Sequence, residues 1–547
     1  MNWEKLSVAS VAAILLLLFL PVFYHVIFYG NNMNYNSDHK IYAIYGNKVL
    51  LALTGVGILA FMAVIYLVRK IPFNRCTVTG FVLLALGVCA AFYFVNVEIA
   101  KCIAFYGGWD CGMVANSARW VYEGGEMGYG DYYTIYTNNV PITWLLYKLY
   151  DLGKEMGNYP YNPEFIWIQF QCFMHTAAVF CSAVTVLLVT QKVGFAALTL
   201  VVNGVLLGLS PWKIIPYTDA STIAIPIVVI FLYAMFVQMK SRWKYCVWLL
   251  WAFVGVLGGI MKATCYVPVI AILLIEVIWV LTGKEQIVSK LKKLILQLVL
   301  LGCGFLVASW CKTEMYQTLH FEYDYDMEIG WRSYLYMGLN EETTGACSPD
   351  AMSLVQEFAG QPRAVREAYE LECVKERMEE KGLKGLFDFW LRKLVMTYND
   401  GTFSWYQEGY FNAVSYEDIT DSSWQEPLRA FYWEDGRDYQ QFVTLSHGIW
   451  LFVLVGVIVE AVMVLLQTVI SFHKGMEKLR TKESSPEMAI SGAAMLTFVG
   501  ILLFLMLFEG RARYLYNNVA VFATMTVMGY CKLVETTSSI CTEVLHR

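Results

Sequence analysis

An acidic residue at the end of an apolar run is the first candidate for chemistry. Asp110 lies in residues 107–112, directly after such a run and before a stretch with helical character. A carboxylate placed there can act as a general base in group transfer. Aspartate is also a good cap for the N-terminus of a helix. The sequence leaves both roles open for Asp110, a catalytic base and a helix cap.

A second candidate is a loop rich in aromatic rings and amides. Residues 132–141 contain Tyr136, Asn138 and Asn139. Sugar and headgroup sites use such side chains, and so does the aromatic belt at a membrane–water interface. We predict that these three residues contact substrate, with the interfacial belt as the alternative.

Charged residues also recur at the ends of apolar runs: Lys213, Asp219, Lys262, Glu509, Arg511 and Arg513, the last followed by Tyr514. Several cations on one face can hold an anionic phosphate, and arginine can do so with two hydrogen bonds. For any single cation, reaching toward lipid headgroups is the alternative. We predict that Lys213, Lys262, Arg511 and Arg513 bind a phosphate, while Asp219, Glu509 and Tyr514 contact the rest of the substrate.

The composition shows what must position these residues. Of the 547 residues, 58% are hydrophobic and only 16% are charged, whereas soluble proteins are about a quarter charged. A chain of this length cannot hide the surplus in one core, so lipid must cover it. No basic run suits nucleic acid, and no cysteine and histidine spacing fits a zinc site.

Apolar windows long enough to cross a bilayer recur twelve times, at 6–30, 47–68, 77–99, 164–190, 194–210, 217–238, 245–261, 265–282, 294–311, 446–471, 488–508 and 515–531. The basic residues of the short loops, such as Arg69, Lys70, Lys240 and Arg242, fall on one side of this topology. The positive-inside rule makes that side cytoplasmic. We therefore predict a multi-pass protein of the cell membrane with both termini in the cytoplasm.

Two segments are too polar to span, and both fall on the extracytoplasmic side. The predicted organisation is a transmembrane core over 1–311 with a first external loop at about 100–163, an extracytoplasmic domain over 312–444, and C-terminal transmembrane helices over 445–547. Helical patterns occur at 112–123, 140–152, 364–380 and 383–396, and the last is amphipathic enough to lie on a membrane or on its own domain. The fold class is an all-α polytopic membrane protein with about 12 transmembrane helices and a mainly α external domain.

The order of these motifs resembles the glycosyltransferase C superfamily of integral membrane glycosyltransferases, which includes protein O-mannosyltransferases and aminoarabinose transferases. The similarity is strongest to bacterial cell-envelope members. It rests on the acid at 109–110, on 136–139, which is similar to a Tyr-Pro-Asn-Asn motif with Thr137 in place of proline, and on 217–219, 262–264, 331–339, 400–402 and 509–514. The chain departs from the family in lacking a second acid beside Asp110, which leaves open whether a divalent cation takes part.

The resemblance implies an inverting transfer at the extracytoplasmic face. The donor would be a polyprenyl-phosphate sugar, and the acceptor a glycan, a lipid or a protein. Asp110 would be the general base, while Lys262, Arg511 and Arg513 would hold the donor phosphate. Three alternatives stay open: a lipid-linked saccharide flippase or transporter, an envelope polysaccharide polymerase or ligase, and a structural membrane protein without chemistry. A transporter predicts charged or broken mid-span positions and paired halves.

Overall fold

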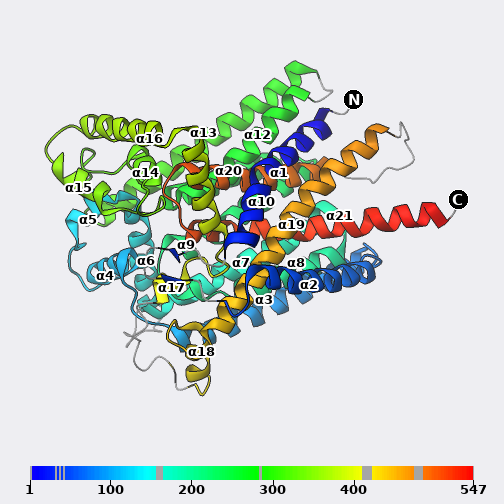
Figure 1. The fold of residues 1–547 in the computed structure, drawn as a ribbon, viewed down its shortest axis with the longest axis horizontal. Helices are drawn as coiled ribbons and strands as arrows, with labels where there is room; N and C mark the ends of the chain where they lie inside the picture. The colour runs from blue at the N-terminus through cyan, green and yellow to red at the C-terminus, as the bar shows by residue number, and fades with distance from the viewer. Residues whose placement is uncertain are drawn as a thin grey trace.

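The structure is a computed structural model that describes residues 3–30, 34–35, 39–40, 43–155, 164–282, 286–409, 420, 422–473 and 485–545. Its long helices are α1 (Trp3–Tyr29), α2 (Asn47–Val68), α3 (Arg75–Ile103), α7 (Glu164–Thr190), α8 (Val193–Leu209), α10 (Ile225–Gln238), α11 (Lys244–Met261), α12 (Tyr266–Thr282), α13 (Ile287–Thr318), α19 (Tyr439–His473), α20 (Ser485–Leu507) and α21 (Val519–Leu545). They form one elongated bundle (Figure 1).

Shorter elements connect these helices. They are α4 (Trp109–Tyr122), α5 (Gly130–Ile135), α6 (Val140–Glu155), α9 (Thr218–Ser221), α14 (Trp331–Gly338), α15 (Pro349–Glu357), α16 (Arg363–Tyr398), α17 (Trp405–Gly409) and α18 (Gln425–Tyr432). The 3₁₀ turns are η2 (Thr137–Asn139), η3 (Pro211–Ile214), η4 (Ala263–Cys265) and η6 (Ala512–Asn518). Strands β1 (Asn34–Tyr35) and β2 (His39–Lys40) pair antiparallel.

The set of apolar helices agrees with the prediction. Among the described residues, eleven segments are long and apolar enough to cross a membrane, and α8 is a shorter apolar helix. The start of α8 packs on the end of α2, where Gly194 leaves no room beside the Val68 carbonyl, and Gly208 near its end abuts Phe92 of α3. Helix α8 therefore follows most of α3 and supplies the twelfth apolar segment.

The two ends of the bundle differ (Figure 1). Helices α4 to α6 and α14 to α16 gather on the left of the view, whereas the chain termini lie on the right. Between these ends, α21 is the central helix, because 89% of its apolar window is buried against 17% for α2, α3 and α13. Helices α2, α3 and α13 therefore present most of their surface to lipid.

Short turns interrupt the helices at the end nearest α4. One divides a predicted continuous span, a second lies at the predicted gap between the windows 245–261 and 265–282, and a third covers the start of the window 515–531. The window 217–238 divides into α9 and α10, with Pro226 in the first turn of α10. Turn η4 separates α11 from α12, and η6 precedes α21. Proline favours the first turn of a helix because it lacks the N–H that the turn leaves unused. These breaks carry Asp219, Lys262 and Arg513, which a continuous helix would direct elsewhere.

The external helices match their predicted positions closely. Gly382, at φ 57°, separates two helical halves of α16, which are the two patterns predicted there. Leu383 and Phe387 are largely exposed while Leu394 is buried, so one face of the second half packs on the protein and the other exposes these two apolar side chains among charged ones. The predicted domain boundaries at 311 and 444 fall inside α13 and α19, because both helices continue past their apolar windows.

Candidate functional site

Asp110 is the second residue of α4, and its side chain does not cap that helix. The N-cap is Gly108, which receives no side-chain cap hydrogen bond. Instead the Asp110 carboxylate accepts a hydrogen bond from the Tyr132 hydroxyl (2.8 Å), and the Tyr217 hydroxyl lies 3.3 Å from its other oxygen. The side chain is 31% exposed. The cap interpretation is therefore wrong, and the carboxylate is held in place while part of it stays accessible.

Tyr132 and Tyr217 belong to a hydrogen-bond network with Asn139, which lies in the predicted loop of aromatic rings and amides at residues 132–141. Asn139 donates to the Tyr132 hydroxyl (2.5 Å), and the Tyr217 hydroxyl lies 3.1 Å from Asn139 Oδ1. Burial and the neighbouring Asp110 charge raise the pKa of both Tyr132 and Tyr217 well above the ordinary range. Both hydroxyls therefore stay protonated and remain donors. Asn139 acts by orienting the groups around Asp110.

Arg513 lies between two carboxylates from distant parts of the chain. Its guanidinium is 3.7 Å from Asp110 and 3.5 Å from Glu408 of α17. Glu408 is almost fully buried, and burial raises its pKa above the usual glutamate range. Glu408 was not among the residues predicted for the site, because 298 residues separate it from Asp110. No local pattern indicates that the two would meet.

Unusual backbone conformations mark the two segments that carry these acids. Trp109, just before Asp110, has φ 47°, and Phe403 and Ser404, just before α17, have φ 58° and 64°. Left-handed conformations are costly for residues other than glycine and cluster at functional sites. The turn before α17 is closed by Asp400, which accepts from the Thr402 amide (2.8 Å). This strain supports a functional assignment for the place where the segments meet.

Lys262 and Asp219 form a buried ion pair at the helix breaks. The Lys262 ammonium lies 2.7 Å from Asp219, and their side chains are 12% and 0% exposed. The ammonium also lies over the Tyr514 ring, 4.4 Å from its centroid. Burial lowers the pKa of Lys262, and the nearby Asp219 charge opposes that shift. The predicted cation is thus present at the site but is already paired with an acid that the sequence analysis assigned to substrate.

Arg511 and Glu509 lie on the loop between α20 and η6. Arg511 donates to Gln407 (3.1 Å) and is 3.7 Å from Glu509. Within the described chain, the buried Nε groups of Arg511 and Arg513 have no hydrogen-bond acceptor. A buried donor without a hydrogen-bond partner is costly, and for the Arg511 Nε the nearby Glu509 carboxylate at 3.7 Å offsets part of that cost.

Of the other predicted residues, Lys213 lies apart from this cluster, whereas Tyr136 and Asn138 border it, and the Tyr136 ring centroid is 5.1 Å from that of Tyr132. Lys213 is fully buried, where it donates to the carbonyl of Gly208 (2.9 Å) and to Asn96. Tyr136 donates to the sulfur of Met352 in the external domain. Asn138 is exposed and donates to Asn139 (3.1 Å). Lys213 therefore supports the helix packing, and the structure does not bring it to the phosphate-binding group.

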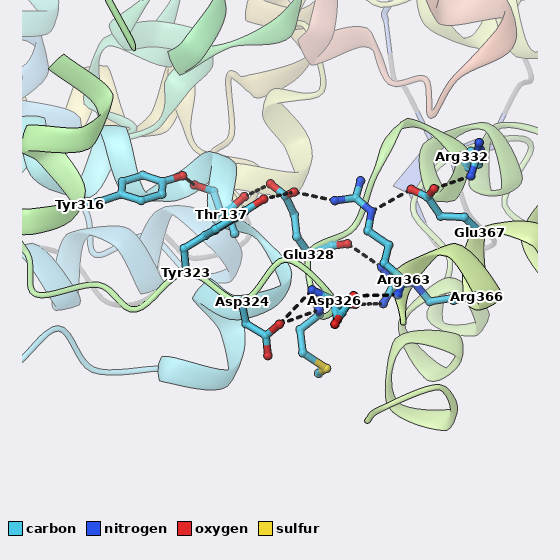
Figure 2. Close-up of polar contacts among 11 residues, drawn as sticks. Thr137, Tyr316, Tyr323, Asp324, Asp326, Glu328, Arg332, Arg363, Arg366 and Glu367 are labelled. Carbon is cyan, nitrogen blue, oxygen red and sulfur yellow. Dashed lines mark hydrogen bonds and ion pairs between the residues drawn. The ribbon is translucent and has the colours of Figure 1, made fainter. Parts of the chain in front are cut away.

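The segment between α13 and α19, which was predicted to form an external domain, anchors the turn that carries Thr137 and Asn139, as Figure 2 shows. Thr137 donates to Glu328, which also accepts from Tyr323 (2.8 Å) and Arg363 (2.7 Å). The Tyr316 hydroxyl donates to the Thr137 carbonyl (3.3 Å). Because Thr137 and Asn139 belong to the same 3₁₀ turn, the charge network of the domain fixes the residues that orient Asp110.

The cations of the site do not exceed its acids. Lys262, Arg511 and Arg513 face Asp110, Asp219, Glu408 and Glu509. A phosphate must therefore compete for the cations or use the unpaired N–H groups of the arginines. No cluster of three or more potential metal ligands among His, Cys, Asp and Glu occurs in the described residues.

Comparison with known proteins gives a family without an assigned chemistry. A protein-family model described as "conserved hypothetical integral membrane protein" matches residues 4–472. No curated protein and no solved structure matches the chain.

Proposed function

The chain belongs to this family of conserved hypothetical integral membrane proteins, and we propose that it is a glycosyltransferase that uses a polyprenyl-phosphate sugar at the end of the bundle carrying Asp110. The observation that carries the proposal is the Asp110 carboxylate, 31% exposed, oriented by Tyr132 and Tyr217, and adjacent to Arg513. A base and a phosphate-binding cation are both needed for this transfer, and here they are neighbours.

In the proposed reaction, Asp110 takes the proton from an acceptor hydroxyl. The acceptor oxygen attacks the anomeric carbon with inversion as the bond from that carbon to the phosphate oxygen breaks. The polyprenyl phosphate leaves with the bonding electrons, and the guanidinium groups of Arg511 and Arg513 stabilise the charge it gains. Lys262, paired with Asp219, keeps the Tyr514 ring in position at the edge of the site.

The donor suits a site at the edge of a membrane. A lipid-linked substrate reaches the site from the bilayer, so the chain needs no nucleotide-binding loop. Asp110, Lys262 and Arg513 lie at the ends of membrane-length helices, where a headgroup phosphate would stand. The proposed acceptor is a glycan, a lipid or a protein. The proposed external domain adjoins the site through the contact of Glu328 with Thr137.

The test is donor consumption by purified protein in lipid nanodiscs, with radiolabelled polyprenyl-phosphate hexoses. Asp110→Asn keeps the shape of the side chain but removes the base, and general base catalysis contributes about 10²–10⁴-fold. We expect a loss of that size in Asp110→Asn. The control Asp131→Asn, which changes an exposed acid in α5, should keep full activity. Equal activity of Asp110→Asn and wild type would overturn the base assignment. Movement of intact donor across the bilayer without turnover would favour a flippase.

A further inference from the structure

A second polar cavity lies at the opposite end of the bundle. It has a volume of about 510 Å³, and its charged lining residues are Arg69, Lys70, Lys192, Lys532, Glu487 and Glu535. Arg69 and Lys70 follow α2 and precede α3, whose far end leads to Asp110. At 1.5 Å per residue, the 29 residues of α3 put roughly 40 Å between this cavity and the candidate active site.

Most of the acidic charge in the cavity is already committed to partners. Lys192 forms an ion pair with Glu535. Lys532 donates to Glu460 (2.7 Å) and to Ser491 (2.9 Å) behind the wall. The other two cations, Arg69 and Lys70, have no carboxylate partner within 4.0 Å in the described part of the chain. With Glu487 also in the lining, the four cations exceed the three carboxylates of the cavity and its wall by one, so the cavity presents a net positive charge.

Two further features indicate that the cavity binds an anion and does not hold water alone. The Arg69 guanidinium stacks on the Tyr66 ring at 4.1 Å, which limits the positions it can adopt. Val186, Phe195 and Met528 add an apolar part to the lining.

We propose that this cavity binds a phosphate group, carried either by an anionic phospholipid headgroup or by a small phosphate ester. The volume lies within the range of about 300–1,000 Å³ typical of small-molecule sites. Arg69 and Lys70 supply the charge, and the apolar lining accommodates the carbon next to the phosphate. The proposal concerns a site separate from Asp110 and does not depend on sugar transfer.

The test measures binding by the purified full-length protein in detergent, by native mass spectrometry and thermal shift. The probes are dioleoyl-phosphatidylglycerol, glycerol 3-phosphate and inorganic phosphate, with dioleoyl-phosphatidylcholine as the zwitterionic lipid control. We expect phosphatidylglycerol to bind more tightly than phosphatidylcholine if the ligand is a lipid headgroup, and glycerol 3-phosphate to bind comparably if it is a soluble ester.

The decisive comparison is between two basic pairs. Arg69→Gln with Lys70→Gln removes the two cations that supply the charge, and we expect binding to weaken by about tenfold or more. Lys240→Gln with Arg242→Gln removes an exposed pair from another short basic loop and is expected to leave binding unchanged. Ser539→Trp, at the edge of the cavity, blocks it without altering charge and is expected to abolish binding. Equal weakening by both pairs, or unchanged binding in Ser539→Trp, would overturn the proposal.

Discussion

Removal of the Lys262 ammonium is expected to destabilise the protein strongly. Its partner Asp219 is fully buried, and the ammonium lies 2.7 Å away. In the variant Lys262→Met, the Asp219 carboxylate would remain buried without its counter-ion. Breaking one side of a buried ion pair costs about 3–5 kcal/mol, which corresponds to roughly a hundredfold or more in the unfolding equilibrium. Because neither side chain is substantially exposed, solvent screening does little to reduce this cost.

The second variant separates the charge effect from loss of packing. Lys262→Met combined with Asp219→Asn removes both charges and keeps most of the volume, so we expect it to recover most of the lost stability. The assay is the thermal unfolding midpoint of detergent-purified protein, supported by reversible unfolding in denaturing detergent. If the double variant were less stable than Lys262→Met, or if Lys262→Met were as stable as wild type, the buried-pair reasoning would be refuted.

Two more predictions concern the external domain. Burial lowers the pKa of Lys393 to about 7, below the value of about 10.4 in an unfolded chain. The unfolded state then binds more protons between these values, so wild-type stability should rise from pH 7 to pH 10 more than that of Lys393→Met, as unfolding midpoints would show. Glu328→Ala should free the turn at Thr137 and speed amide exchange there by about tenfold. The exposed control Glu322→Ala should not, and unchanged exchange in Glu328→Ala would contradict the anchoring role.

The sequence predicted the transmembrane architecture well because apolar length is a local property. The window 47–68 coincides with α2, and the patterns at 112–123 and 140–152 correspond to α4 and α6. The division of α16 was predictable from two patterns with Gly382 between them. The gap between the windows 245–261 and 265–282 predicted the break beside Lys262. The break beside Asp219 was not predicted, since the residues on both sides of it are apolar enough to continue a span.

The candidate site was only partly predictable, because its contacts join distant segments. Position at the ends of apolar runs identified Asp110, Lys262, Arg511 and Arg513. The same criterion selected Lys213, which packs inside the bundle instead. Position along the sequence could not indicate which acids would pair with which cations. The ion pair of Asp219 with Lys262, for example, forms because two helix breaks pack together. Likewise, Glu408 reaches Arg513 only because the strained turn at 403–404 directs α17 into the bundle.

The most direct test of the central claim is a structure of the protein bound to a non-transferable polyprenyl-phosphonate sugar in nanodiscs. We predict that the phosphonate lies within hydrogen-bonding distance of Arg511 and Arg513, using the Nε groups that now lack acceptors, with the anomeric carbon facing Asp110. Analogue density that leaves both arginines in their present ion pairs, or that places the sugar away from Asp110, would contradict the proposed transfer site.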